Sequence, residues 1–344
     1  MNTVDLLAEI LKREGVEYLS CFPTTPVIES AAAAGIRPII CRQERVGVGI
    51  ADGYSRVHNG SKVGVFAMQS GPGAENAYAG VATAYSDSTP ILLLPTGHPR
   101  ERQGVLPHFN SVTNFAGVTK YIEQINTAGR TTDVMRRAFA GIYQGRPGPV
   151  MVEIPSDVAL EEVPEEAIHW GKNFPNLGSA GNPKDVESAA HALVTARYPV
   201  IHAGQGVLYA DASDELVELA ELLSIPVMTT LLGKSAFPET HPLALGSGSG
   251  VMSGTLYHFM QRSDVIFGIG CSFTKHGMSM NIPDGKTMIH ASNDHRDINK
   301  DYNIGYPIVG DAKLILRQMI DACQDLVGNG KRGDQSLEQE IVKE

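Results

Sequence analysis

The alternation of short apolar segments with helical patterns constrains the fold of this chain more than any other feature. In the first half, the apolar segments are apolar throughout, rather than at every second residue, and helical spacing separates them. Strands of that kind are buried on both faces, which is typical of a parallel sheet covered by helices. The expected strands are 18–23, 37–42, 62–70, 90–97 and 148–155, and the expected helices are 74–88 and 131–144.

The same alternation resumes in the second half, after an acidic, Pro- and Gly-rich stretch without sustained periodicity. At 344 residues the chain is long for a single core, so two domains are expected. The sequence predicts two doubly wound α/β domains with mostly parallel sheets and helices on both faces. Their expected bounds are 1–160 and 183–326, with a linker over 161–182 and a polar C-terminal tail over 327–344.

Composition excludes several classes of function. The formal net charge is −10, so the chain lacks the cationic excess that non-specific nucleic-acid binding needs. No apolar run reaches the length of a membrane helix, and the amphipathic start, with acids before Lys12 and Arg13, is unlike a signal peptide. The four scattered cysteines have no metal-binding spacing and are expected to be buried thiols in a reducing compartment. We therefore expect a cytoplasmic protein without a metal site of its own.

Glu44 lies between Arg42 and Arg45, where the apolar segment 36–41 ends and a helix rich in small residues begins. One interpretation is a surface salt bridge between the carboxylate and these arginines. The other is a carboxylate placed at the end of a buried strand for chemistry.

A glycine-rich turn, Gly71-Pro72-Gly73, connects the expected strand 62–70 to the expected helix 74–88. Glycines let the chain turn tightly and let a ligand approach the backbone, and the helix N-terminus attracts negative charge. A tight connection without any ligand would use the same residues. Asn76 favours a binding site, because it places a polar side chain at the start of the helix.

Other motifs are weaker. The segment "HAGQGV" (202–207) lacks the third glycine of a dinucleotide fingerprint, and "GSGSG" (246–250) indicates a flexible turn. His98 and His108 lie in an expected loop, where a solvated histidine is the ordinary alternative to a proton-transfer role. There is no nucleophile elbow and no Walker loop.

In combination, the segments resemble the thiamine-diphosphate-dependent acetolactate synthase and 2-oxo-acid decarboxylase superfamily. The resemblance rests on "RQE" (42–44) followed by "ADGYSR", on "SGPGAENAYAGVATAYSDSTP" and on "GRPGPVMVEIPSDV" (145–158). "RYPVIHAGQGV" and "YPIVGDAKLIL" are similar to the central domain of that family. The resemblance identifies 1–160 as a pyrimidine-binding domain and 183–326 as a central Rossmann-like domain.

The resemblance implies a catalytic role for Glu44. In that family a carboxylate hydrogen-bonds to N1′ of the cofactor's aminopyrimidine and favours the imino tautomer that removes the thiazolium proton, which is acid–base catalysis through the cofactor. It also implies that Thr25, Pro26, Gly71 and Asn76 line the same pocket.

The resemblance also places three residues near the substrate. Asn110 stands where acetolactate synthases usually carry a glutamine that faces the reacting centre, so an altered substrate pocket is expected. His98 and His108 replace residues typical of those synthases and are candidate catalytic proton donors.

The diphosphate- and Mg²⁺-binding domain of the family, with its "GDG…N" segment, has no counterpart in the sequence. We expect a separate subunit to supply it, together with Mg²⁺, in a heterotetramer of two large and two small chains. The pair would decarboxylate a small 2-oxo acid, then release an aldehyde or join the fragment to a second carbonyl compound. The alternative is a non-catalytic binding or regulatory module derived from the same fold.

The central domain of acetolactate synthases holds a non-catalytic FAD. Here "GCSFTKH" (270–276) replaces the usual "GxRFDDR", and "HASND" (290–294) replaces the usual "HIDID". With that arginine and the first acid absent, the sequence predicts no functional FAD, whereas an ADP-like ligand is still possible.

Overall fold

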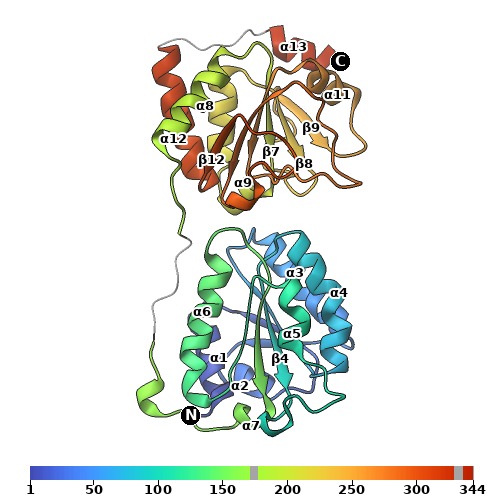
Figure 1. The fold of residues 1–344 in the computed structure, drawn as a ribbon, viewed down its shortest axis with the longest axis vertical. Helices are drawn as coiled ribbons and strands as arrows, with labels where there is room; N and C mark the ends of the chain where they lie inside the picture. Colours follow the sequence, from blue (N-terminus) through green and yellow to red (C-terminus); the bar gives the residue numbers. More distant parts are fainter. Residues whose placement is uncertain (171–176, 329–335, 344) are drawn as a thin grey trace. The chain divides into compact units, whose positions relative to one another are not determined.

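The computed structural model describes residues 1–170, 177–328 and 336–343 (Figure 1). They form two compact units, Met1–Leu177 and Gly178–Glu344, each built around its own sheet. None of the helices described has the length and apolar character needed to cross a bilayer.

The first unit contains a sheet of six parallel strands in the order β2-β1-β3-β4-β6-β5. The strands are β1 (Tyr18–Cys21), β2 (Arg37–Ile40), β3 (Gly64–Met68), β4 (Ile91–Gly97), β5 (Tyr121–Gln124) and β6 (Val150–Pro155). The helices are α1 (Thr3–Arg13), α2 (Val27–Ala33), α3 (Glu44–Val57), α4 (Pro72–Ser86), α5 (Ser111–Phe115), α6 (Thr131–Tyr143) and α7 (Ser156–Ala159), with single 3₁₀ turns η1 (Arg100–Arg102), η2 (Ala116–Val118), η3 (Ala128–Arg130) and η4 (Glu165–Ala167).

Helices cover both faces of this sheet, as the uniformly apolar strands predict. Buried residues of α1, α2 and α6 pack on one face, and those of α3 and α4 pack on the other. Helix α3 lies very close to the sheet, since a Cβ atom added to Gly64 would lie 2.0 Å from the carbonyl oxygen of Ala51. The position of Glu44 at the start of α3 is therefore fixed by close helix–sheet packing.

The second unit has the same architecture, with six parallel strands in the order β12-β11-β10-β7-β8-β9. The strands are β7 (Pro199–Ala203), β8 (Val227–Thr230), β9 (Ala244–Gly248), β10 (Val265–Ile269), β11 (Thr287–Ser292) and β12 (Tyr306–Val309). The helices are α8 (Pro183–Thr195), α9 (Gln205–Tyr209), α10 (Ser213–Leu223), α11 (Gly254–Arg262), α12 (Ala312–Val327) and α13 (Ser336–Lys343), with a 3₁₀ turn η5 (His295–Asp297). The predicted fold class, two parallel sheets flanked by helices, is confirmed.

Three predictions about local structure need correction. Residues 161–168, expected to begin the linker, pack on the first unit, where Val163 is buried with Leu6 and Ala128; residues 171–176 of that linker lie outside the described part. The expected tail contains α13, because Leu337 and Ile341 lie one turn apart and both pack on the core of the second unit. The expected turn 246–250 begins inside β9. All four cysteines are buried, as predicted.

Candidate functional site

Strand order locates a binding crevice in the first unit. The chain proceeds from β1 to β2 on one side and returns to β3 on the other side of β1, so the direction of winding reverses between β1 and β3. In open parallel sheets, ligands bind beyond the carboxyl ends of the strands at such a point. The predicted site residues Thr25, Glu44 and Gly71 follow β1, β2 and β3 in turn, so the topology brings them to this edge.

Glu44 is the first residue of α3, and only 5% of its surface is exposed. Asn76, in α4, donates a hydrogen bond from Nδ2 to Glu44 Oε2 over 2.9 Å. This contact joins two predicted site residues that are 32 positions apart in the sequence. The carboxylate is therefore buried and held in one orientation by the neighbouring helix.

Neither arginine beside Glu44 serves as its counter-ion. Arg42 and Arg45 are both exposed, and among the residues that the structure describes neither forms an ion pair with this carboxylate. The salt-bridge interpretation of the sequence is therefore wrong.

Gly73 is a site residue that the sequence did not single out by itself. A Cβ atom added to it would lie 2.7 Å from Glu44 Oε1 and 2.7 Å from the Cβ atom of Gln69. A side chain is therefore excluded from the position next to the carboxylate. The only signal for this in the sequence is the second glycine of the "GPG" turn.

Gly73→Ala should displace the Glu44 carboxylate and lower the free energy of unfolding by about 1–3 kcal/mol, the usual cost of overpacking. Gly53→Ala is the matched control, because Gly53 lies inside α3 with nothing within 4 Å of an added Cβ atom. That control should raise stability by roughly 0.5–1 kcal/mol through the better helix propensity of alanine. Denaturant unfolding of both variants checks the prediction, and equal stabilities would contradict it.

Gly71 and Pro72 form the start of α4. Gly71 has φ +58°, a conformation that side-chain-bearing residues rarely adopt, and Pro72 occupies the first helical position. Helix α4 continues for 15 residues from this point, so its positive end lies beside the buried carboxylate and stabilises its negative charge.

Thr25 and Pro26 lie between β1 and α2. The Thr25 side chain is buried, and no residue that the structure describes forms a hydrogen bond with its Oγ1 atom. A buried hydroxyl without a partner is costly, and a ligand with a polar ring edge would supply the missing hydrogen bond. Pro26 precedes the first residue of α2 and is half-buried.

His98 and His108 come together in the loop after β4, with ring centroids 4.0 Å apart. Arg102, which the sequence did not single out, lies with Nη2 3.5 Å from His108 Nε2. Partial desolvation lowers the pKa of His108, and the neighbouring His98 and Arg102 add to this effect. The cluster therefore places the His108 imidazole, whose pKa is lowered, beside the guanidinium of Arg102.

Asn110 lies at the start of α5. Its side chain is exposed and caps α5, accepting a hydrogen bond at Oδ1 from the backbone N–H of Thr113 over 2.8 Å. The Asn110 side chain therefore forms its hydrogen bond with the backbone of the helix that it caps.

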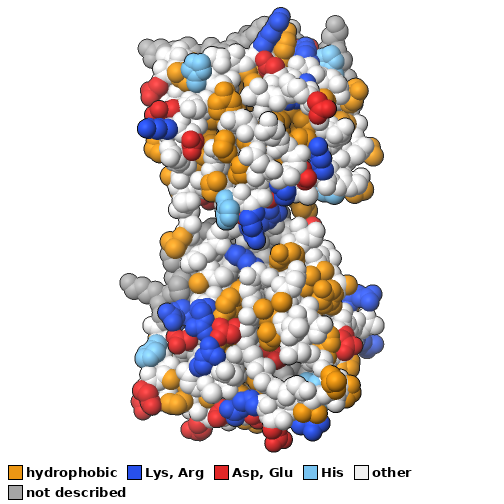
Figure 2. Space-filling view, viewed as in Figure 1, with side chains coloured by type: hydrophobic (Ala, Val, Ile, Leu, Met, Phe, Trp, Pro, Cys, Tyr) orange, Lys and Arg blue, Asp and Glu red, His pale blue; other side chains and the backbone are white. Residues whose placement is uncertain are grey.

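Two helices next to Glu44 expose apolar side chains. Val46 and Ile50 on α3 are 52% and 36% exposed, and Tyr78 and Tyr85 on α4 are 39% and 43% exposed. Figure 2 shows apolar side chains gathered over these two helices. We call Val46, Ile50, Tyr78 and Tyr85 the α3/α4 surface.

In the second unit, close packing accounts for the glycines of the segment "HAGQGV" (202–207). In the "HAGQGV" turn, the N–H of Gly206 donates to the carbonyl of Gly270 over 2.8 Å, and an added Cβ atom on Gly206 would lie 2.7 Å from Gly270 Cα. These glycines let two turns touch at the carboxyl edge of the sheet. The motif is therefore accounted for without a nucleotide.

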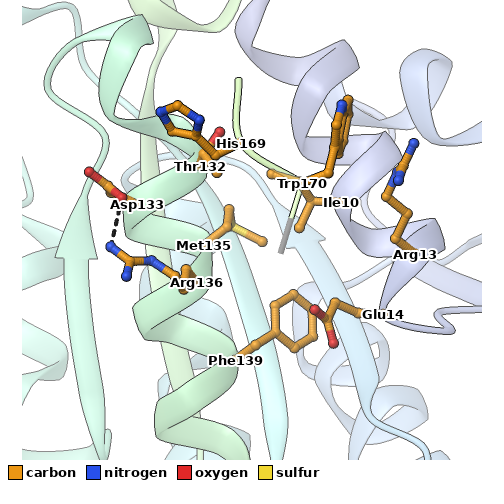
Figure 3. A pocket seen from close by; sticks show the side chains of 10 residues that line it. All are labelled: Ile10, Arg13, Glu14, Thr132, Asp133, Met135, Arg136, Phe139, His169 and Trp170. Carbon is orange, nitrogen blue, oxygen red and sulfur yellow. Dashed lines mark hydrogen bonds and ion pairs between the residues drawn. The ribbon is translucent and has the colours of Figure 1, made fainter. Parts of the chain in front are cut away.

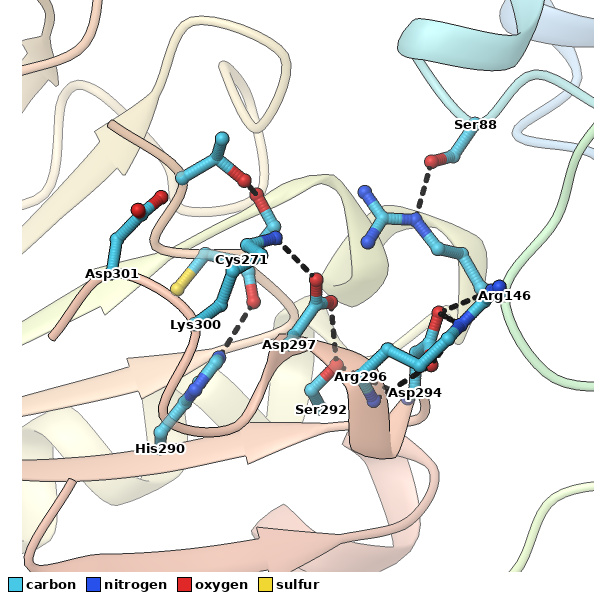
Figure 4. Close-up of polar contacts among 12 residues, drawn as sticks. Ser88, Arg146, Cys271, His290, Ser292, Asp294, Arg296, Asp297, Lys300 and Asp301 are labelled. Carbon is cyan, nitrogen blue, oxygen red and sulfur yellow. Dashed lines mark hydrogen bonds and ion pairs between the residues drawn. The ribbon is translucent and has the colours of Figure 1, made fainter. Parts of the chain in front are cut away.

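At the carboxyl end of β11, the segment 290–294 contributes to a polar cluster (Figure 4). Ser292 Oγ donates to Asp297 Oδ2 over 3.1 Å, and Lys300 Nζ lies 2.7 Å from Asp297 Oδ1. His290 Nε2 lies 2.9 Å from the carbonyl of Cys271.

Comparison with known proteins places both units in one family. Residues 1–128 match the family described as thiamine pyrophosphate enzyme, N-terminal TPP binding domain, and residues 186–319 match thiamine pyrophosphate enzyme, central domain. A solved benzoylformate decarboxylase from Polynucleobacter necessarius is similar in fold, with a TM-score of 0.81 and 23% identity over 94% of this chain and 61% of that chain.

Curated relatives agree with this assignment. A probable acetolactate synthase large subunit of Methanococcus aeolicus is 34% identical over 98% of this chain and 58% of its own length. Acetolactate synthase isozyme 3 large subunit of Escherichia coli K12 is 32% identical over 93% and 58%, and glyoxylate carboligase of Escherichia coli O157:H7 is 30% identical over 96% and 57%. The chain thus spans less than three fifths of the length of these relatives. It belongs to the thiamine pyrophosphate enzyme family, and its two units carry that family's N-terminal and central domains.

Proposed function

We propose that this chain supplies the pyrimidine-binding half of a thiamine diphosphate site and acts on a small 2-oxo acid together with a second polypeptide. The observation that carries the proposal is the buried Glu44 carboxylate, oriented by Asn76 and kept accessible by Gly73.

The residues at this edge of the sheet fit an aminopyrimidine ring. Glu44 offers a carboxylate for a protonated ring nitrogen, and Thr25 offers a buried hydroxyl that has no partner among the described residues. Gly71 and Gly73 remove side chains where the ring would approach the backbone. In this proposal Thr25, Pro26, Glu44, Gly71 and Asn76 hold the pyrimidine.

Thiamine diphosphate, when bound, supplies the electron sink that loss of carboxylate from a 2-oxo acid requires. Glu44 would hold a proton at ring nitrogen N1′, and Asn76 would keep its carboxylate aligned. His98 and His108 would move a proton at the substrate, because an imidazole ring can both accept and donate a proton. Asn110 would line the substrate side.

The second polypeptide would carry the diphosphate-binding domain and Mg²⁺. The α3/α4 surface supports this part of the proposal, since it exposes four large apolar side chains next to the site, and such patches mark protein interfaces. Two chains of each kind would give the simplest closed assembly. The product would be an aldehyde, or a carboligation product as the names of the relatives suggest.

Co-expression with a chain that carries a "GDG…N" segment tests the assembly. We expect the two chains to co-elute and to release CO₂ from a 2-oxo acid. Val46→Glu should abolish co-elution, because it places a charge in the α3/α4 surface, whereas Leu160→Glu is the control at a 67% exposed residue outside that surface. If the complex forms but releases no CO₂ from any 2-oxo acid, the result would favour a binding or regulatory module instead.

A further inference from the structure

A pocket of about 370 Å³ lies between α1 and α6 of the first unit and is closed by Trp170 (Figure 3). Its apolar floor consists of Ile10, Met135 and Phe139, of which the last two are fully buried. Helices α1 and α6 cover the sheet face opposite α3 and α4. The pocket is therefore separated by the sheet from Glu44 and from the proposed cofactor site.

The charged groups around this pocket differ in whether they have a partner. Asp133 and Arg136 neutralise each other at the rim, with 2.7 Å between Oδ1 and Nη2. Arg13 stacks on the indole of Trp170, 3.8 Å from the ring centroid. Glu14 is half-buried, and within the described part of the chain no hydrogen bond or ion pair reaches its carboxylate.

The surroundings of Glu14 favour a cationic partner. Burial raises the pKa of this carboxyl group, so its negative charge is poorly solvated. Glu14 and Phe139 both line the pocket (Figure 3). Burial raises the pKa of the Tyr143 phenol to about 12, and the negative charge of Glu14 adds to this effect. Tyr143 therefore lies within electrostatic range of the Glu14 carboxylate. A carboxylate flanked by aromatic rings is the arrangement that recognises organic ammonium groups.

We propose that this pocket binds a small organic cation, a primary ammonium group on an apolar or aromatic skeleton. The ammonium pairs with Glu14, and the skeleton packs on Ile10, Met135 and Phe139. This site is independent of the proposed function, because none of these residues belongs to the crevice at the carboxyl edge of the sheet.

The chain contains a single tryptophan, and it lines this pocket, so its fluorescence reports occupancy directly. The full-length chain would be titrated with 2-phenylethylammonium, with the neutral isostere 2-phenylethanol and with the anion 3-phenylpropionate. We expect a saturable fluorescence change, with the amine binding at least about tenfold more tightly than the alcohol, which corresponds to one charge-assisted contact.

Glu14→Gln should reduce the affinity for the amine by the same factor and leave the alcohol unchanged. Glu9→Gln is the matched control, because Glu9 is an acid of the same helix α1 that does not line the pocket, and it should retain amine binding. Should Glu14→Gln not fold, the wild-type pH series decides: amine affinity should fall as the pH falls through the pKa of Glu14, which lies above the ordinary 4.5. Equal affinities for amine and alcohol, tighter binding of the anion, or the absence of a saturable change would overturn the proposal.

Discussion

Replacing Glu44 by Gln should lower turnover of the assembled enzyme by about 10²–10⁴-fold, the range that a positioned acid–base group contributes. The amide has nearly the shape of the carboxylate, so it can still contact Asn76, which now donates to Glu44 Oε2 over 2.9 Å. It cannot carry the negative charge that, in the proposed role, would hold a proton at the ring nitrogen. Assembly and cofactor affinity should change much less than turnover.

Exchange of the cofactor's C2 proton, followed by NMR in deuterated buffer, measures this effect without reference to a substrate. Glu75→Gln is the matched control, since Glu75 is an exposed acid in the first turn of α4. Exchange should be slow in Glu44→Gln and normal in Glu75→Gln. Normal exchange in Glu44→Gln would remove the role assigned to this residue.

The second large effect concerns the pH dependence of stability and arises from His202 in the second unit. His202 lies on β7, where both its ring nitrogens are buried and, within the described ranges, neither has a hydrogen-bond partner. Its ring contacts Phe273, which in turn contacts His290. Burial, with a smaller effect from His290, lowers the pKa of His202 from 6.5 to about 4.

Because the pKa of His202 is lower in the folded state, the unfolded chain binds more protons between pH 6.5 and about 4. The free energy of unfolding is therefore unaffected by His202 above pH 6.5, and it falls as the pH drops from 6.5 to about 4. At about 1.4 kcal/mol per pKa unit, the loss from this residue approaches about 3 kcal/mol. The pKa of His290 is also lowered by burial, so it adds to the same trend.

His202→Leu should remove most of this pH dependence and stabilise the second unit at pH 5, because an apolar side chain needs no partner in this core. His191→Leu, at an exposed position of α8, should retain the full dependence. Hydrogen exchange of peptides covering β7 and β10, measured from pH 7 to 5, reports the stability of this unit alone. If the stability of His202→Leu depended on pH as steeply as that of the wild type, His202 would not be the source of the pH dependence.

The sequence predicted most strands because burial on both faces leaves a plain apolar run. It missed the edge strands β5, β9 and β12, which pair on one side only. Residues Tyr121–Gln124 carry Glu123, which pairs with Arg137 over 2.8 Å, and β9 contains Gly246 and Gly248. An edge strand needs no apolar run, so periodicity carried no signal for β5 or β9.

The sequence motifs named the members of the proposed site but not the contacts between them. Glu44 and Asn76 were recognisable from the motifs around them, whereas their hydrogen bond depends on how closely α3 and α4 approach. That approach also explains Gly73, whose neighbours lie on α3 and in the preceding turn. For Asn110, the position in the motif gave no information about its contact, which is the capping of α5.

In the proposed function, this chain holds half of a thiamine diphosphate site and another polypeptide completes it. Calorimetric titration of thiamine diphosphate with Mg²⁺ into this chain, into the diphosphate-binding chain and into their mixture tests it most directly. We expect binding in the mixture alone, at one cofactor per pair of chains. Tight binding by this chain alone, or a stable complex of the two chains that binds no cofactor, would contradict the claim.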